Sequence, residues 1–415
     1  MDTEITIERL GHQGDGVAEG PIFAPRTLPG ERVSGILNGT RLSDVRVVTP
    51  SDDRVRPPCR HAKACGGCQL QHASTRFVAS WKEDIVRTAL AAQGLAPAFH
   101  TMHTSPPATR RRATFAARRT KKGAMVGFHG PASDVIVENP DCQLVDPAIL
   151  AGRACVEALA VVGGSRKGAL AASITTSRGG LDVTVSGGKP LDGPLRITLA
   201  QVADQFGLAR LAWEGETVVT RSQPAQSFGA ALVVPPPGAF LQATPEGEAA
   251  LVTGVTQAVG AAARVVDLFS GCGTFALPLA QSSEVHAVES EGDMLEAMDL
   301  AWRATQGLKR LSTETRDLYR RPLLIDELAR FEAAVLDPPR AGAEAQVAEL
   351  AKAKLPVIAY VSCNPVTFAR DARHLTQAGY QLDWIQVVDQ FRWSVHIELV
   401  SRFSWPEGAK NPGLR

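Results

Sequence analysis

The 415-residue sequence contains no apolar run long enough to cross a lipid bilayer. Its first residues, Met-Asp-Thr-Glu-Ile-Thr-Ile-Glu, also lack the basic and then apolar segments of a secretory signal peptide. We therefore expect a cytoplasmic protein without a membrane partner. Thiols stay reduced in that compartment, so cysteines there more often bind metal or act in catalysis than form disulfides.

The chain also lacks appreciable net charge, internal repeats and low-complexity tracts. Its 44 lysines and arginines nearly balance its 43 acids, and its 44% hydrophobic content is ordinary for a globular protein. The length predicts two or three domains. Charge is nevertheless uneven, because residues 101–135 hold seven lysines or arginines, all within 110–122, against a single acid, Asp134. This basic block is either a phosphate-binding surface or a solvated loop face.

Four of the seven cysteines form a recognisable set. Cys59, Cys65 and Cys68 lie close together, and Cys142 follows much later in an Asn-Pro-Asp-Cys-Gln segment. Three close thiols and one remote thiol suit a tetrahedral sulfur site. Zinc and an iron–sulfur cluster both accept four thiolates, and two disulfides are the structural alternative. We favour the iron–sulfur cluster.

Hydrophobic patterning divides the chain into three parts. Residues 1–50 alternate polar and apolar residues between glycine turns, which predicts a small all-β barrel. Residues 51–235 follow as a central, mainly β domain that includes the cysteines. Within it, apolar residues recur every four positions over 71–93, which predicts a helix with one buried stripe. From residue 236 to 415, strands alternate with helical segments, which predicts a doubly wound α/β domain. The strands expected there are 264–269, 285–289, 333–337, 357–362 and 395–400.

A glycine-rich turn follows the first of these strands. Gly271 and Gly273 would let a ligand approach the backbone closely at the carboxyl edge of the sheet. Glu289 ends the next strand, where a carboxylate can accept hydrogen bonds from both hydroxyl groups of a ribose. The pattern fits a nicotinamide dinucleotide and S-adenosylmethionine equally well, so it leaves the ligand open.

Three later segments help to choose between these two ligands. Asp337-Pro-Pro-Arg suits a methyltransferase better than a dehydrogenase, because it shapes a rigid pocket facing a methyl donor. Cys363 lies between a strand end and a predicted helix, whose first amides favour a thiolate over a thiol. A buried structural cysteine is the alternative. Glu398 lies on the last predicted strand, on the face opposite Val395 and Ile397.

Taken together, these motifs resemble the RNA (uracil-C5)-methyltransferases, and among them the iron–sulfur branch that modifies 23S ribosomal RNA. The resemblance spans nearly the whole chain, and residues 1–50 resemble a TRAM domain, an RNA-binding β-barrel. The motifs that carry it are Phe240-Leu-Gln, Asp337-Pro-Pro-Arg, Ser362-Cys-Asn-Pro, His396-Ile-Glu and the cysteine spacing. The positions that depart from the family's usual pattern are Ala243-Thr244, Thr274 and Arg392.

The resemblance implies two cofactors, S-adenosylmethionine and a 4Fe–4S cluster, in a monomeric protein whose partner is RNA. The cluster ligands would be Cys59, Cys65, Cys68 and Cys142. The methyl donor would contact Gln242, Phe269, Gly271, Gly273, Thr274, Glu289, Asp317 and Asp337. The catalytic residues would be Cys363 and Glu398. The helix over 71–93 is also a candidate to pack on the catalytic domain.

In the implied reaction, Cys363 adds to C6 of a flipped-out uracil, C5 takes the methyl group, and Glu398 removes the C5 proton. The TRAM-like barrel and the basic block would hold the RNA by its backbone and shape. We expect 23S ribosomal RNA as the substrate, with transfer RNA second. A DNA cytosine-C5 methyltransferase is disfavoured because Cys363 follows Ser362 rather than a proline. A catalytically silent RNA-binding or ribosome-assembly protein is disfavoured because both catalytic residues are present.

Overall fold

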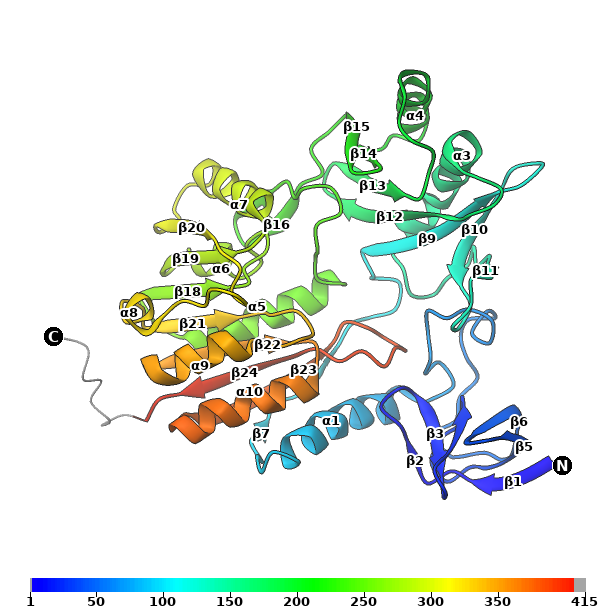
Figure 1. Cartoon of the computed structure of the whole chain (residues 1–415), viewed down its shortest axis with the longest axis horizontal. Coiled ribbons are helices and arrows are strands. Elements are labelled where there is room, and N and C mark those ends of the chain that lie inside the picture. Colours follow the sequence, from blue (N-terminus) through cyan, green and yellow to red (C-terminus); the bar gives the residue numbers. More distant parts are fainter. Residues whose placement is uncertain (1, 407–415) are drawn as a thin grey trace.

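The computed structural model describes residues 2–406, which form three regions, each built on its own sheet (Figure 1). In Figure 1 the N-terminal sheet lies beside helix α1 (Thr75–Ala91), and the central region lies above this sheet. The C-terminal sheet and its helices form the left half of the view. None of the helices among the described residues is sufficiently long and apolar to span a membrane.

The N-terminal region is a six-stranded sheet with the order β1-β5-β6-β4-β3-β2. Its strands are β1 (Asp2–Thr6), β2 (Arg9–Leu10), β3 (Asp15–Ala18), β4 (Ile22–Pro25), β5 (Arg32–Asn38) and β6 (Arg41–Thr49). The apolar residues of the alternating pattern form a separate small core of Ile7, Ala18, Ala24, Val33 and Leu42. The predicted all-β character of this region is confirmed, whereas the barrel form and the TRAM assignment stay predictions.

The central region is a seven-stranded sheet with the order β11-β10-β9-β12-β13-β14-β15. Its strands are β9 (Arg112–Arg119), β10 (Ala124–His129), β11 (Ile136–Val137), β12 (Leu170–Ser177), β13 (Gly180–Ser186), β14 (Arg210–Trp213) and β15 (Glu216–Thr220). Its helices are α2 (Pro147–Ala151), α3 (Arg153–Gly163) and α4 (Gly193–Gln205). Helices α3 and α4 share one core with the sheet, so this region is less purely β than its turn-rich sequence indicates.

The C-terminal region confirms the predicted doubly wound domain. Its sheet has the order β20-β19-β18-β21-β22-β24-β23-β7, and β8 also pairs with β23. The strands are β7 (Ala98–Phe99), β8 (His103–Thr104), β18 (Arg264–Leu268), β19 (Glu284–Glu289), β20 (Leu311–Thr315), β21 (Ala333–Leu336), β22 (Val357–Ser362), β23 (Gln381–Asp389) and β24 (Leu399–Ser404). A separate hairpin, β16 (Gln226–Phe228) and β17 (Ala231–Val233), precedes them.

Helices cover both faces of this sheet, as alternation along the strands requires. Val266 and Leu268 pack in one layer with α1, α9 and α10, whereas Val265 packs in the other with α5, α6 and α7. The helices are α5 (Pro245–Val259), α6 (Ala276–Leu279), α7 (Gly292–Ala304), α8 (Ile325–Leu328), α9 (Glu344–Ala353) and α10 (Pro365–Ala378). Val86 and Leu90 of α1 enter the first layer, so residues 75–104 join the catalytic sheet although they precede the central region.

One predicted strand is displaced. The strand expected over 395–400 begins only at Leu399, because β24 runs antiparallel to β22 and its first partner, Leu399, pairs with Ser362. Glu398 therefore lies in the connection that precedes the strand rather than on a strand face. Strands β18 to β22 are parallel, so their carboxyl ends meet at one edge of the sheet. This edge gathers most of the predicted site residues.

Candidate active site

Glu289 joins the turns that follow β18 and β19. Its carboxylate accepts hydrogen bonds from the Gly271 N–H at 3.1 Å and from the Ser290 N–H at 2.6 Å. Gly271 has φ +53°, and a Cβ there would meet nothing within 4 Å, so this side of the turn is open. A Cβ on Gly273 would instead come within 2.8 Å of Met298 Cγ. Gly271 thus leaves space for a ligand, whereas Gly273 permits the turn to pack on α7.

Asp267, near the end of β18, is a site residue that the sequence analysis missed. Its side chain is fully buried, and neither carboxyl oxygen has a hydrogen-bond partner within the described residues. Burial and the nearby Asp337 raise its pKa well above the usual value, although the Ala276 amide lies near enough to favour the charged form slightly. Its signal in the sequence was a single acid within an apolar strand, Val-Val-Asp-Leu.

A chain of four side chains crosses the edge from Asp337 to Glu398. Gln242 donates from Nε2 to Asp337 Oδ2 at 3.3 Å and accepts at Oε1 from Gln390 Nε2 at 2.6 Å. Gln390 Nε2 also donates to Glu398 Oε2 at 3.1 Å, and its Oε1 accepts from the Ala243 N–H at 2.7 Å. Gln390 was not predicted, because a glutamine just after a strand carries no signal of its own.

The two predicted catalytic residues extend from the same end of neighbouring strands. Cys363 follows Ser362, the partner of Leu399, and Glu398 precedes Leu399. Glu398 is buried, and burial together with the nearby Asp337 raises its pKa to about 8. Burial, followed by the nearby charge of Glu289, likewise raises the pKa of Asp337 to about 7.

The expectation that the helix amides favour a thiolate at Cys363 is wrong. Burial, followed by the charges of Glu398 and Asp337, raises the pKa of Cys363 to about 12, and Arg340 offsets this only in part. Helix α10 does begin beside it, with Asn364 as the capping residue. The helix amides are therefore outweighed by desolvation and by two neighbouring carboxylates.

Asp317 lies in the connection between β20 and α8, where its carboxylate accepts from the Tyr319 N–H at 3.0 Å. The Tyr319 ring in turn lies 5.5 Å from the ring of Phe269, which leads into the glycine turn. Thr274 is half-buried at the end of the same turn.

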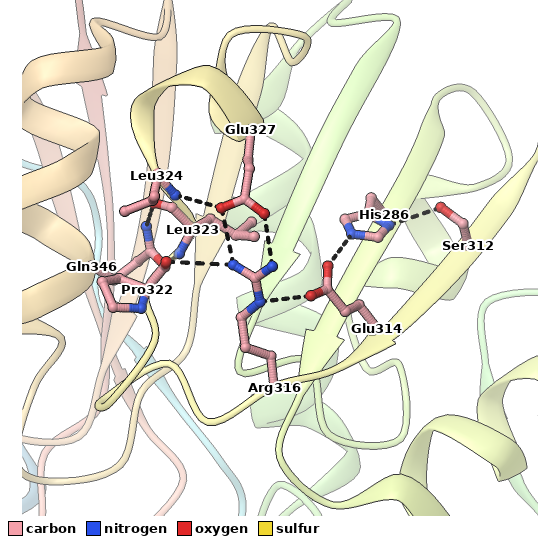
Figure 2. Close-up of polar contacts among 9 residues, drawn as sticks. All are labelled: His286, Ser312, Glu314, Arg316, Pro322, Leu323, Leu324, Glu327 and Gln346. Atoms are coloured by element: carbon pink, nitrogen blue, oxygen red, sulfur yellow. Dashed lines mark hydrogen bonds and ion pairs between the residues drawn. The ribbon is translucent and has the colours of Figure 1, made fainter.

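Figure 2 shows the polar contacts that hold the connection between β20 and α8. Arg316 donates to Glu314 at 2.6 Å and to both oxygens of Glu327, and His286 contacts Glu314 at 3.3 Å.

The four predicted metal-ligand cysteines line one cavity of about 270 Å³. All four thiols are free, as are the other three cysteines of the described chain, which excludes the two-disulfide alternative in this structure. The Gly67 N–H and the Asn139 side chain both face Cys65 Sγ, at 3.4 and 3.9 Å. Within residues 2–406, no group of three or more His, Cys, Asp or Glu side chains is placed to hold a single metal ion.

Comparison with known proteins identifies the family. Residues 237–401 match the family described as tRNA (uracil-5-)-methyltransferase. An RNA methyltransferase of Rhizobium meliloti is 44% identical over 96% of this chain and 98% of its own length. The 23S rRNA (uracil(1939)-C(5))-methyltransferase of Halomonas elongata is 31% identical over 98% of this chain and 90% of its own length. The chain belongs to the RNA (uracil-C5)-methyltransferase family.

The fold agrees with this assignment. The structure of a Pyrococcus abyssi tRNA (uracil-54, C5)-methyltransferase in complex with S-adenosyl-L-homocysteine matches the methyltransferase described here with a TM-score of 0.75. The match covers 96% of this chain and 99% of the Pyrococcus chain at 23% identity. The likeness therefore extends over all three regions of the fold and not only over the catalytic sheet.

The basic block of the methyltransferase divides into residues with different environments. Arg111 is buried, donates to the Gln242 carbonyl at 2.9 Å and pairs with Glu248, so it positions Gln242 and is not free to bind phosphate. Arg112 lies over the exposed Phe240 ring at 4.3 Å, and Arg110 over Phe391 at 5.8 Å. The remaining basic residues lie on the β9–β10 hairpin: Arg118, Arg119, Lys121 and Lys122.

Proposed function

We propose that this protein transfers a methyl group from S-adenosylmethionine to C5 of a uridine in 23S ribosomal RNA. The observation that carries the proposal is the placement of Cys363 and Glu398 at one end of two paired strands. Gln390 and Gln242 connect Glu398 to Asp337 at the same edge. The proposed nucleophile, the proposed base and a proposed donor-binding residue are therefore adjacent in the fold, as this chemistry requires.

The edge of the sheet suits a positively charged methyl donor. Asp267, Glu289, Asp337 and Glu398 bring four carboxyl groups together, and the Asp267 oxygens lack partners within the described residues. S-Adenosylmethionine, a sulfonium cation, would supply an electrophilic methyl group and positive charge beside these acids. Gly271 leaves the open space, and Glu289 and Asp317 are the acids proposed to hold the donor's polar groups.

The Cys363 thiolate is proposed to attack C6 of the uracil. A bond forms between sulfur and C6, and the electrons of the C5=C6 bond move onto O4 to give an enolate. C5 then takes the methyl group, and the electrons of the broken carbon–sulfur bond stay with the donor. Because two carboxylates raise the pKa of Cys363, positive charge at the edge favours the reactive thiolate.

Glu398 is proposed to complete the reaction. Its carboxylate takes the proton from C5, the C5=C6 bond re-forms, and Cys363 leaves as a thiolate. A pKa of about 8 places this acid close to neutral pH, where a general base is most effective. The hydrogen bond from Gln390 favours the carboxylate form and orients it.

The cysteine cavity is proposed to hold a 4Fe–4S cluster. The four thiols surround one cavity, yet no three of the described side chains converge on a point that suits a single ion. Zinc needs its four sulfurs at about 2.3 Å, whereas a cubane cluster accepts ligands that are farther apart. The cluster is unneeded by the chemistry. It would instead shape the segment in which Gln69 and Leu70 both donate from N–H to the Trp393 carbonyl at 2.9 Å.

RNA is proposed to lie across the N-terminal sheet, a TRAM-like domain, and the exposed basic residues of the central region. Ribosomal RNA is preferred as the substrate because the Halomonas relative named for 23S rRNA covers nearly the whole chain. Transfer RNA is the second candidate, since the matching family is described by that substrate. Arg112 and the Phe240 ring beneath it are proposed to form a stacking surface near Gln242 for an unpaired base.

Methylation of defined transcripts tests the proposal. Purified protein, tritiated S-adenosylmethionine and either a 23S rRNA fragment or transfer RNA should give 5-methyluridine in the first RNA only. Mapping 5-methyluridine in both RNAs from a strain lacking this protein identifies the nucleotide. If the strain loses the modification from transfer RNA alone, the assignment of 23S rRNA as the substrate is wrong. If Cys363→Ala keeps full activity, the proposed mechanism is wrong.

A further inference from the structure

Lys82 of helix α1 is a buried cation whose hydrogen-bond acceptors all lie in one segment of the catalytic domain. Its side chain is wholly buried, and its Nζ lies 2.7 Å from Asp389 Oδ1. The same Nζ donates to the Phe391 carbonyl at 3.2 Å and to the His396 carbonyl at 2.9 Å. An ammonium group has three donors, and these acceptors use all of them.

Packing of the helix does not require a lysine at this position. The other buried residues of α1 are Val78, Trp81, Val86 and Leu90, which form an ordinary apolar stripe. Removing an ammonium group from water costs several kcal/mol even when it is paired, and burial lowers the pKa of Lys82 despite the opposing effect of Asp389. A leucine would fill this face at a smaller cost, so apolar packing alone does not account for the charge.

The contacts fix both ends of the segment that carries the proposed base. We call residues 390–398 the base loop. Asp389 immediately precedes the loop and also accepts from the Phe391 N–H at 3.0 Å. Gln390, the next residue, donates to Glu398 at 3.1 Å, and His396 lies two residues before Glu398. Lys82 therefore cross-links the start of the loop to its end.

We propose that Lys82 is a positioning residue for the proton-removal step, holding the base loop so that Glu398 can reach C5 of the bound uracil. The inference rests on the proposed role of Glu398 as the base. It makes α1, which precedes the central region in the chain, part of the active site. Loss of Lys82 should slow the release step while leaving RNA recognition and Cys363 addition in place.

The test compares Lys82→Met with a matched control, Arg210→Met. Arg210 forms a buried ion pair with Asp182 at 2.6 Å in the central region, so both variants lose one buried cation. For Lys82→Met we expect kcat to fall about tenfold to a hundredfold, as for a base displaced by about 1 Å. The KM for RNA should stay within about twofold, and a denaturation-resistant, methylated RNA adduct should accumulate. Arg210→Met should show no adduct.

A double variant separates positioning from stability. Lys82→Met leaves Asp389 buried and unpaired, whereas Lys82→Met/Asp389→Asn removes that charge and should recover much of the lost Tm. If Lys82 positions the loop, kcat stays low and the adduct persists in the double variant, because the Phe391 and His396 carbonyls remain unlinked. Recovery of kcat together with Tm would overturn the proposal.

Glu398→Gln in the same assay distinguishes the two levels of inference. If Glu398→Gln accumulates adduct and Lys82→Met turns over normally, the role of Lys82 is wrong and the base assignment stands. If Glu398→Gln forms no adduct and turns over like wild type, the base assignment itself fails. Adduct in both variants supports both.

Discussion

Replacing Glu398 by glutamine should stabilise the folded protein, and increasingly so as the pH rises. The side chain is only 3% exposed, and burial with the nearby Asp337 raises its pKa from the ordinary 4.5 to about 8. Below pH 4.5 the carboxyl is protonated in both the folded and the unfolded state. Between pH 4.5 and 8 the unfolded chain has released this proton and the folded protein has not, so wild-type stability falls as the pH rises.

The size of the effect follows from the same pKa. Each pH unit within this window costs about 1.4 kcal/mol, so raising the pH from 5 to above 8 should lower wild-type stability by about 4 kcal/mol through this group. Glutamine cannot ionise, so the variant does not lose stability through this group as the pH rises. The free energy of unfolding of Glu398→Gln, measured relative to wild type, should therefore increase by roughly that amount between pH 5 and pH 9.

Urea denaturation of both proteins at the two pH values provides the measurement. Glu327→Gln is the control, because the Arg316 side chain and the Leu324 amide hold the pKa of Glu327 at about 2. Glu327 is ionised in both states above pH 5, so its variant should differ from wild type equally at pH 5 and pH 9. A difference for Glu398→Gln that is also independent of pH would show that this carboxyl ionises normally, and the reasoning would be refuted.

Three further outcomes are expected. Cys363→Ala should abolish methylation while keeping wild-type RNA affinity in a filter-binding assay, and measurable turnover would contradict its role. In the wild type the hydrogen bond from Gln390 favours the Glu398 carboxylate, so Gln390→Met should raise the pKa of Glu398 and move the rise of the pH–rate profile to higher pH. An unchanged profile would argue against the contact. Anaerobically purified protein should be brown and contain about four iron atoms per chain, and Cys142→Ala should lose them; colourless protein with stoichiometric zinc would overturn the cluster.

Local patterns in the sequence predicted much of the fold. The alternation over residues 1–50 and the strand–helix alternation after residue 235 both correspond to sheets in the structure. Helices α3 and α4 were not predicted, because the sequence of the central region indicated a mainly β domain. The last strand was placed four residues too early, since its start depends on pairing with β22, which no local pattern encodes.

The sequence by itself determined which residues are proposed to carry the chemistry. Cysteine, glutamate and the glycine turn are recognisable by residue type and by their place at strand ends, because parallel strands deliver their carboxyl ends to one edge. Only the tertiary structure decided the pKa values and the hydrogen-bond partners of these residues. The pKa of Cys363, the lack of a hydrogen-bond partner for Asp267 among the described residues, and the contacts of Lys82 and Gln390 all depend on burial and on neighbours distant in the chain. Electrostatic free energies follow distance and solvent exclusion in space, which sequence separation does not reveal.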